Sequence, residues 1–183
     1  MYQNDNIMSI SEVRPRRTPA GDAFTDLVVE VAWLGGMFTA AGEALARTAD
    51  QTLARWVILD AIEGEPATVA QVARRRGIAR QAVQRVADLL ERDGLIVYQP
   101  NPKHRRAQLL RSTPRGREVL HTISVAQKSW ADALGPQIGV HKLGRATDLI
   151  KQIRRTVSAN PSPARSPEDS GRQRRNRIQA ALR

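Results

Sequence analysis

The chain of 183 residues contains no cysteine and only three histidines. The absence of cysteine excludes disulfide bonds, thiolate metal sites and redox sensing through a thiol. The three histidines, His104, His121 and His141, are far apart in the sequence and form no H-E-x-x-H pair. There is also no G-x-S-x-G elbow and no glycine-rich loop of the kind that holds phosphate. The sequence therefore predicts a protein that is not an enzyme and that uses no metal or cofactor.

Long hydrophobic runs are also missing. The longest apolar run, Val31 to Gly42, has 12 residues and lies between Glu30 and Glu43, whereas a membrane-spanning helix needs about 20. The first ten residues, MYQNDNIMSI, lack the basic start and apolar segment of a secretory signal. We therefore expect a soluble, cytoplasmic protein with no membrane partner and one domain with a modest core.

The net charge of +11 is unevenly distributed along the chain. Residues 65–117 contain 12 basic and 4 acidic residues, whereas residues 1–64 contain 5 basic and 9 acidic ones. A concentrated positive field is what a protein needs to displace counterions from a phosphate backbone. A membrane-surface protein would instead place its basic residues along an amphipathic helix beside exposed aromatics. The charge pattern favours a nucleic-acid partner bound through residues 65–117.

Two short helices are predicted inside this basic region. Thr68 followed by Gln71 is a capping-box start, and Gly77 is suited to end the first helix. After a short joint, a second helix buries one apolar side, formed by Ala82, Val83, Val86, Leu89 and Leu90. Its opposite side carries four residues able to bond phosphates and base edges: Arg80, Gln81, Gln84 and Arg85.

A basic hairpin is predicted to follow. Gly94 ends the second helix, Leu95 to Tyr98 favours a strand, and Ala107 to Leu110 supplies the returning strand. The tip, residues 100–106, combines turn formers with basic or potentially basic side chains that include His104, Arg105 and Arg106. Helix, turn, helix and hairpin in this order predict a winged-helix head over about residues 53–117. From the residues alone, a solvated basic face or a winged helix that binds proteins is also compatible with the pattern.

These residues resemble the MarR (multiple antibiotic resistance regulator) family of bacterial transcription regulators. The resemblance rests on T-x-x-x-[VL]-A at Thr68 to Ala73, RQAVQRVADLLERDGLI at Arg80 to Ile96, and RRAQLLRSTPRG at Arg105 to Gly116. By layout it extends over about residues 24–157. It implies a mainly α fold with a small β-hairpin wing, in which a winged helix-turn-helix is flanked by N- and C-terminal dimerisation helices. It also implies binding to double-stranded DNA and control by a small, often aromatic or phenolic effector.

The sequence departs from the family pattern at two positions. Members commonly carry Asp where this chain has His104, so an acidic residue expected to orient the wing arginine is missing. We expect a more mobile wing, or a contact between His104 and phosphate that weakens as pH rises, because histidine titrates near neutrality. Members also often have Ser or Thr where Ala79 stands, and losing that cap should cost about 1 kcal/mol of helix stability.

Amphipathic helices are predicted on both sides of the head. Their expected ranges are Phe24 to about Ala49, Leu53 to Ile62, Thr113-Pro114 to a break at Gly135-Pro136, and about Val140 to Val157. Gly35-Gly36 in the first helix is expected to mark a bend or a close helix contact. The first and last helices offer more apolar surface than a small head can cover. We expect burial against a second copy, although packing within one chain is the alternative.

The two ends of the chain lie outside the predicted domain, which covers residues 21–157. Residues 1–20 lack a periodic apolar pattern and are predicted to form a flexible arm. Residues 158–183 begin with a Pro/Ser-rich stretch and end in a basic cluster, which predicts a disordered basic tail. The tail is compatible with nonspecific phosphate contacts, with a short helix from Gln173 to Leu182, or with no role.

The predicted function is a homodimeric, sequence-specific transcription regulator, a repressor that occupies its operator and is released by an effector. Trp33, Met37 and Trp56 are candidate effector contacts by resemblance, but for Trp56 the sequence favours a core position over a ligand contact, and one side chain can serve as both. Two alternatives are an architectural protein that coats DNA without reading sequence and a winged helix that binds a protein partner. Gln81 and Gln84 argue against both, because coating phosphates needs cations rather than amides.

Overall fold

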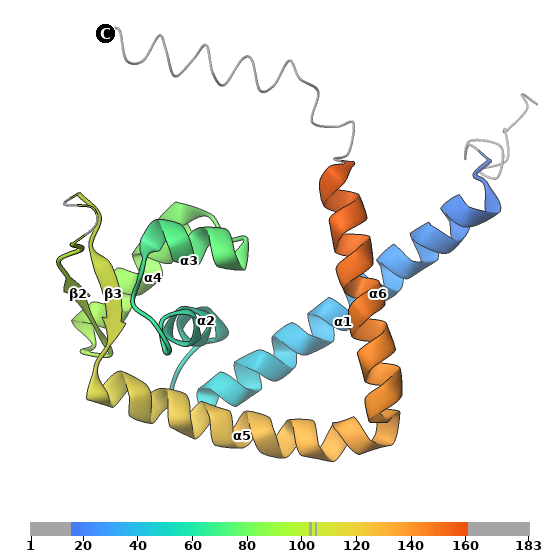
Figure 1. The fold of residues 1–183 in the computed structure, drawn as a ribbon. Coiled ribbons are helices and arrows are strands. Elements are labelled where there is room, and N and C mark those ends of the chain that lie inside the picture. Colours follow the sequence, from blue (N-terminus) through green and yellow to red (C-terminus); the bar gives the residue numbers. More distant parts are fainter. Residues whose placement is uncertain (1–15, 103, 105, 161–183) are drawn as a thin grey trace, which may run out of the picture. The chain divides into compact units, whose positions relative to one another are not determined.

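The computed structural model describes residues 16–102, 104 and 106–160. These residues form helices and a small antiparallel sheet (Figure 1). The elements in chain order are α1 (Pro19–Arg47), α2 (Leu53–Ala61), β1 (Ala67–Thr68), α3 (Val69–Arg76), α4 (Arg80–Arg92), β2 (Ile96–Gln99), β3 (Leu109–Ser112), α5 (Pro114–Ile138) and α6 (Val140–Ala159). The described chain divides into two compact units, one up to residue 128 and one from residue 129. The first contains α1 to α4, the sheet and the beginning of α5, and the second contains the end of α5 and α6.

The helix-turn-helix formed by α3 and α4 confirms the prediction. Thr68 Oγ1 accepts a hydrogen bond from the Gln71 amide at 3.2 Å, and Gln71 Oε1 accepts one from the Thr68 amide at 2.8 Å, which completes the capping box. Gly77 ends α3 in the left-handed conformation, with φ of 66°, where glycine has no Cβ to clash. Helix α4 follows Ala79, whose side chain provides no capping hydrogen bond.

The sheet has the strand order β1-β3-β2, and both pairs are antiparallel. Strands β2 and β3 form the wing, with Tyr98 opposite Leu110. Strand β1 was not predicted, because two residues are too few to show an alternating pattern. It places Thr68, which caps α3, opposite Leu109 of the wing. The structure therefore confirms a mainly helical winged helix-turn-helix.

One apolar core fills the head. Its largest fully buried side chains come from α2, α3, α4, the sheet and α5: Ile58, Leu59, Ile62, Val72, Val83, Leu90, Leu95, Ile96, Leu110 and Leu120. The start of α5 lies unusually close to the end of α4. A Cβ on Gly116 would stand 2.1 Å from the backbone oxygen of Leu95, so only glycine fits there. Thr113 strengthens this joint, because its hydroxyl donates to the Gly94 oxygen at 2.8 Å.

Helix α1 begins at Pro19, five residues before the predicted start. Thr18 accepts a hydrogen bond from the Gly21 amide at 3.1 Å, and proline suits the first turn because it has no amide to satisfy. The helix therefore takes in the end of the segment expected to be a flexible arm, whereas residues 1–15 lie outside the described residues. Within the described part of the chain, no heavy atom beyond the adjoining part of α1 itself lies within 4 Å of a Cβ built on Gly35 or Gly36, so the pair makes no close helix contact within one chain.

Helix α1 is longer than the apolar run on which the expectation about membrane spans was based. It has 29 residues, and by length and composition alone it is apolar enough to cross a membrane. The sequence argument considered only the uninterrupted run of 12 residues, but a helix that continues past isolated charges reaches the required length. Core helices of soluble proteins and signal sequences have the same property, so a single helix of this kind is weak evidence for a membrane span.

The sequence predicted a break in helix α5 at Gly135-Pro136. This prediction is wrong, because the helix continues to Ile138. Pro136 lies in the last turn, where proline removes a single backbone hydrogen bond. The helix ends at Gly139, whose φ of 92° suits glycine and whose amide donates to the Gly135 oxygen at 2.9 Å. Helix α6 then runs to Ala159. The expected C-terminal tail and its short helix lie outside the described residues from residue 161 onward.

Candidate nucleic-acid interface

Helix α4 has one buried side and one polar, exposed side. Val83, Ala87 and Leu90 are fully buried in the head. The four residues predicted to contact DNA, Arg80, Gln81, Gln84 and Arg85, are all exposed. The buried side anchors the helix, and the exposed side presents guanidinium and amide groups, which can bond phosphates and base edges.

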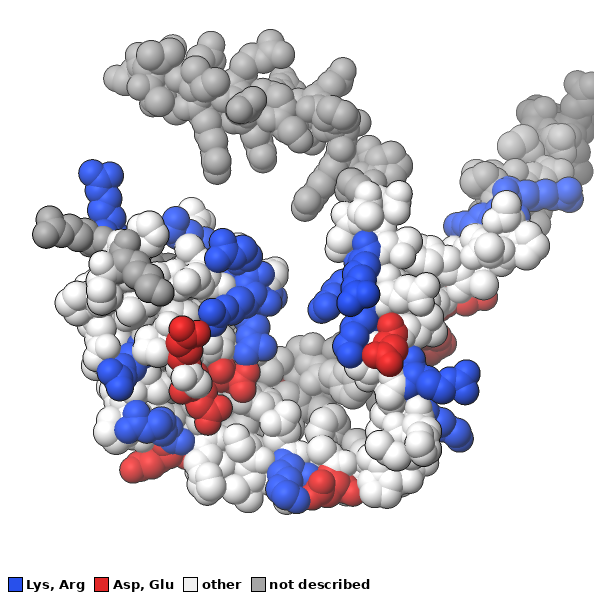
Figure 2. Space-filling view, in the orientation of Figure 1, with Lys and Arg blue, Asp and Glu red and all other residues white. Residues whose placement is uncertain are grey.

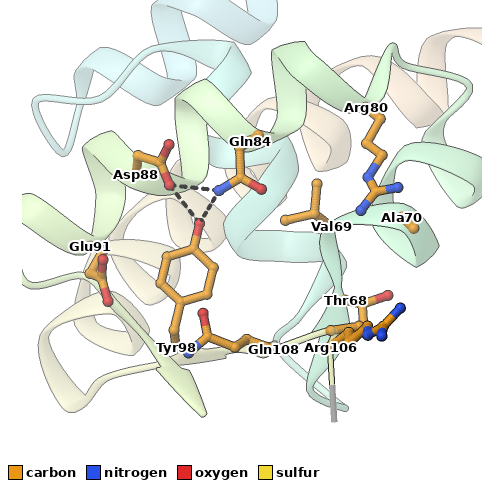
Figure 3. A pocket seen from close by; sticks show the side chains of 11 residues that line it. Thr68, Val69, Ala70, Arg80, Gln84, Asp88, Glu91, Tyr98, Arg106 and Gln108 are labelled. Atoms are coloured by element: carbon orange, nitrogen blue, oxygen red, sulfur yellow. Dashed lines mark hydrogen bonds between the residues drawn. The ribbon is translucent and has the colours of Figure 1, made fainter. Parts of the chain in front are cut away.

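A groove lies between α4 and the wing, and we call it the α4–wing groove (Figure 3). Its volume is about 560 Å³, and it is lined by Thr68, Val69, Ala70, Arg80, Gln84, Asp88, Glu91, Tyr98, Arg106, Ala107 and Gln108. The groove brings Arg80 and Gln84 of the helix together with Arg106 of the wing. Gln81, Arg85 and His104 are not among its lining residues, and Arg105 lies outside the described residues.

Gln84, Asp88 and Tyr98 form a closed triangle of hydrogen bonds in this groove (Figure 3). Gln84 Nε2 donates to Asp88 Oδ1 at 2.7 Å and to Tyr98 Oη at 2.8 Å, and Tyr98 Oη donates to Asp88 Oδ1 at 2.7 Å. Partial burial of Tyr98, together with its hydrogen bond to Asp88, raises the pKa of its hydroxyl above the ordinary value of 10.0. Sequence reasoning missed this contact because Tyr98 comes from another element.

The tip of the wing contains His104, whose side chain is exposed. Its backbone amide donates to the Asn101 oxygen at 3.2 Å, and its oxygen accepts from the Ala107 amide at 3.1 Å. These bonds form the turn between the strands, so His104 occupies the end of the wing as the sequence predicted. Lys103 and Arg105 on either side of it lie outside the described residues.

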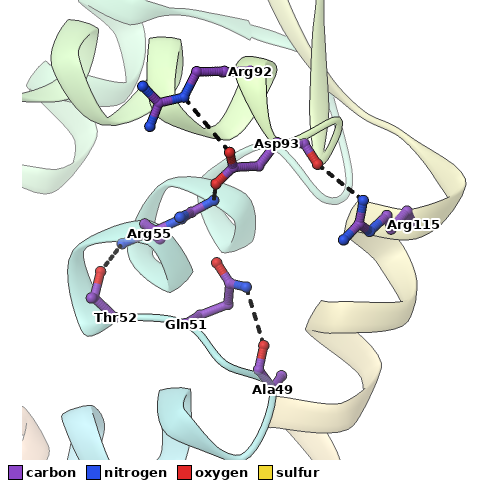
Figure 4. A network of polar contacts seen from close by, with 7 residues as sticks. All are labelled: Ala49, Gln51, Thr52, Arg55, Arg92, Asp93 and Arg115. Atoms are coloured by element: carbon purple, nitrogen blue, oxygen red, sulfur yellow. Dashed lines mark hydrogen bonds and ion pairs between the residues drawn. The ribbon is translucent and has the colours of Figure 1, made fainter.

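A second polar network fastens the C-terminal end of α4 to α2 and α5 (Figure 4). Arg55 Nη2 lies 2.5 Å from Asp93 Oδ2, Arg92 Nε lies 3.8 Å from Asp93 Oδ1, and Arg115 Nη1 donates to the Asp93 backbone oxygen at 3.3 Å. The hydrogen bond from Arg55 lowers the pKa of the Asp93 carboxyl below its ordinary value of 3.8. Because α2, α4 and α5 all contribute, this network fixes the direction in which α4 points. No pattern in the sequence indicated this network.

Basic side chains gather over α3 on the face of the head in Figure 2. Arg74, Arg75 and Arg76 are exposed in its last turn, where cations also interact favourably with the helix dipole. Arg76 forms an ion pair with Asp60 of α2. The charge bias noted in the sequence is therefore found on the exposed surface of the head.

The candidate effector contacts do not form one site. Trp33 and Met37 lie on α1, where with Ala32, Gly36 and Ala40 they line a shallow depression of about 590 Å³. Trp56 is not among its lining residues and instead packs against the core of the head, which is the position that the sequence favoured for it. Among the described residues, no group of three His, Asp or Glu side chains is arranged to hold a metal ion.

Known proteins are similar to this chain in sequence and in fold. The MarR family model matches residues 50–107. An uncharacterized protein of Mycobacterium tuberculosis strain H37Rv is 40% identical over 119 residues, which cover 63% of this chain and 83% of that protein. An uncharacterized protein of Mycobacterium bovis matches to the same extent. The chain belongs to the MarR family. As a member of the MarR family, it is a DNA-binding transcription regulator.

Solved structures of MarR family proteins have the same fold. A MarR family transcription regulator superposes with a TM-score of 0.70 at 22% identity, covering 78% of this chain and 97% of that one. MarR of Staphylococcus aureus, in complex with salicylate and kanamycin, gives 0.67 at 16% identity, with coverages of 75% and 94%. CouR of Rhodococcus jostii RHA1, bound to p-coumaroyl-CoA, gives 0.60 at 20% identity, with coverages of 75% and 94%. At these identities the likeness concerns the fold alone.

Proposed function

We propose that this MarR family protein is a homodimeric, sequence-specific regulator, and that it acts as a repressor by occupying an operator. The observation that carries the proposal is the exposed polar side of α4, which is supported by a packed core and bordered by the α4–wing groove. A helix of this kind fits the major groove of B-DNA, where base edges present distinct patterns of donors and acceptors.

The exposed residues have separate roles in this proposal. Arg80 and Arg85 pair with guanine or phosphate, and Gln81 and Gln84 bond the edges of other bases. Arg106, with Arg105, contacts phosphates or enters the adjacent minor groove from the wing. His104 contacts phosphate at the wing tip.

A second copy of the chain is the proposed cover for α1. Four large apolar side chains of α1, which we call the α1 stripe, are between 42% and 51% exposed: Phe24, Val28, Val31 and Leu34. Helix α6 also has exposed apolar residues, among them Leu149 and Ile150. Burying such surfaces in a twofold interface removes them from water. It also places two α4 helices about 34 Å apart, as a pseudo-palindromic operator requires.

We also propose that the protein is soluble and cytoplasmic, because a dimer that covers the α1 stripe leaves no need to anchor α1 in a membrane. Fractionation of cells that express the full chain tests this, and we expect the chain in the soluble fraction. Retention in membranes after a wash with high salt, which removes proteins held by charge alone, would instead assign α1 to the bilayer.

A small aromatic or phenolic effector is proposed to bind beside α1 and to release the protein from DNA. Solved relatives contain salicylate or p-coumaroyl-CoA, and the depression lined by Trp33 and Met37 offers an apolar surface. An effector acts only if it binds the DNA-incompetent arrangement more tightly. Titration with salicylate should quench Trp33 fluorescence and weaken DNA binding together, and a Trp33→Phe variant identifies the quenched residue.

The central test is sequencing of genomic fragments selected by the purified protein at about 150 mM salt, where nonspecific binding is weakened. We expect a pseudo-palindrome with half-sites about 10 bp apart, and its loss in Arg80→Ala. Arg154→Ala, an exposed arginine of α6, is the matched control and should recover the same motif. Fragments without a shared motif would support DNA coating instead, and recovery of almost no DNA would support a protein-binding winged helix.

A further inference from the structure

The side chain of Gln84 is held in one orientation before any DNA is bound. Its nitrogen lies 2.7 Å from Asp88 Oδ1 and 2.8 Å from Tyr98 Oη. Figure 3 shows the amide oxygen pointing away from these two groups, toward the side of the groove where Val69 and Arg80 lie. A free glutamine would rotate and present either end of its amide.

Chemistry decides which end of the amide faces Asp88. A carboxylate has no hydrogen to donate, so a partner at 2.7 Å must be a donor. The amide nitrogen meets this requirement and the amide oxygen does not. Tyr98 adds to the same preference, because its hydroxyl donates its only hydrogen to Asp88 and can then only accept from Gln84. Turning the amide over would therefore set oxygen against oxygen at both contacts.

The two partners of Gln84 come from different elements of the head. Asp88 lies four residues further along α4 and therefore on the same side of the helix. Tyr98 lies in β2, is paired with Leu110 of β3, and packs against the core of the head. The orientation of Gln84 thus depends on the wing strand as well as on the recognition helix. This is a role for Tyr98 that follows from no local sequence pattern.

We propose that Tyr98 and Asp88 hold Gln84 with its amide oxygen toward the DNA, so that Gln84 selects a base that presents an exocyclic amino group in the major groove. The proposal rests on the proposed function, in which α4 enters that groove. Adenine N6 and cytosine N4 are donors there, whereas guanine O6 and N7 and thymine O4 are acceptors. Gln84 then favours adenine or cytosine on the strand it faces and disfavours guanine and thymine. Tyr98 and Asp88 are positioning residues, and Gln84 alone contacts the base.

The test compares base preferences in DNA selected from random sequence by the wild type, Tyr98→Phe, Gln84→Ala and Gln81→Ala. The wild type should favour adenine or cytosine at one position of each half-site by about three- to tenfold, the range of one hydrogen bond. Gln84→Ala should abolish that preference, and its position identifies the base that Gln84 reads. Tyr98→Phe should reduce the preference at the same position toward equality, because it removes the hydroxyl and keeps the ring. Gln81→Ala, an exposed neighbour on α4, should change a different position.

Affinity for random DNA and thermal unfolding provide the readouts that separate orientation from general damage. Both should be nearly unchanged in Tyr98→Phe, because the ring still packs against the core. An equal preference at the Gln84 position in Tyr98→Phe and wild type would overturn the proposal while leaving the protein a sequence-specific regulator. A wild type that selects no motif would overturn the proposed function as well.

The free protein allows a test that needs no DNA. NMR spectra of the full chain should show a Gln84 side-chain amide whose proton shifts move in Tyr98→Phe and in Asp88→Asn, as expected for hydrogens bonded to those groups. The side-chain amide of Gln81, which is exposed on the same helix, is the internal control and should not move. Gln84 amide shifts equal to those of a solvated glutamine in the wild type would contradict the held orientation.

Discussion

In the head, Ile58, Leu90 and Ile96 are at most 2% exposed, whereas Val28, Val31 and Leu34 of α1 are between 42% and 51% exposed. The head assembles its core from several short elements, each of which covers another. Helix α1 is longer than any of these elements, and its two fully buried residues, Gly42 and Ala46, lie near its C-terminal end, where Leu53 packs against Gly42. One chain therefore completes the core of the DNA-binding head and leaves the α1 stripe about half exposed.

A dimeric regulator must set both the direction of each α4 helix and the distance between the two α4 helices, and these two properties depend on different parts of the chain. The direction of α4 is fixed within one chain by the core, by Gly116 and by the network around Asp93. In the proposed dimer, the distance between the two α4 helices depends on how the second copy packs on the α1 stripe. The proposed effector would change this distance, and with it DNA binding, without disturbing the head.

The largest effect on stability is expected from a substitution that creates a cavity in the core of the head. Leu90→Ala removes a fully buried side chain of α4, and such substitutions typically cost about 2–5 kcal/mol of unfolding free energy. Leu89→Ala on the same helix is the control, because Leu89 is 38% exposed and should cost less than about 1 kcal/mol. Chemical denaturation of both variants measures the difference. Equal costs would mean that the head is not built around this core.

A smaller loss of stability is expected at the joint between α4 and α5. Gly116→Ala places a methyl group against the Leu95 backbone oxygen, and overpacking of this kind typically costs about 1–3 kcal/mol. Gly64→Ala is the matched control, since no atom lies within 4 Å of its added Cβ. Thermal unfolding should separate the two variants, and an unchanged midpoint in Gly116→Ala would contradict the close approach.

Placing a charge on the α1 stripe should weaken assembly while leaving the head folded. In a dimer of Val31→Glu, each copy places one carboxylate in the proposed interface. Because burying a charge is costly, the dimer dissociation constant should rise by at least about tenfold. Ala44→Glu lies about 140° around the helix from Val31 and serves as the control. Sedimentation velocity over a range of concentrations measures the dissociation constants. A weaker dimer in Ala44→Glu than in Val31→Glu would place the interface on another side of α1.

The smallest effect is expected from the acid titration of Asp93. Its pKa is lower in the folded chain than its ordinary value of 3.8, mainly because of the hydrogen bond from Arg55. A carboxyl group whose pKa is lowered by folding stabilises the fold at pH values above its ordinary pKa. This contribution is lost as the pH falls through the pKa of the folded state. The stability difference between wild type and Asp93→Asn should therefore be constant near neutrality and shrink below about pH 4. Denaturation at several pH values measures it, and a difference independent of pH would contradict the ion pair.

Local signals explain which parts of the fold were predictable. The capping box at Thr68 and Gln71 and the stop at Gly77 depend on neighbours within one helical turn, and the structure contains them as predicted. Strand β1 depends on pairing with a strand more than 40 residues later, and two residues carry no pattern of their own. At the end of α5, Gly139 rather than Gly135-Pro136 stops the helix, because a proline in a last turn is tolerated and a glycine with positive φ is decisive.

The candidate site was predictable to a similar extent. Helical periodicity was enough to place Arg80, Gln81, Gln84 and Arg85 on one side of α4. It was not enough to orient Gln84, because Tyr98 is 14 residues away and reaches it only once the wing has folded. The ion pair of Arg55 with Asp93 joins residues 38 apart, and their spacing in the sequence gives no sign of contact.

The most direct test is the number of chains bound to one operator, measured by sedimentation equilibrium on a duplex that carries both half-sites recovered by selection. If one chain supplies a complete reading head and a second copy covers α1, two chains should bind per duplex in a single step. A duplex with one half-site scrambled should then bind the same dimer more weakly. One chain per duplex, or independent binding of single chains to the two half-sites, would contradict the account.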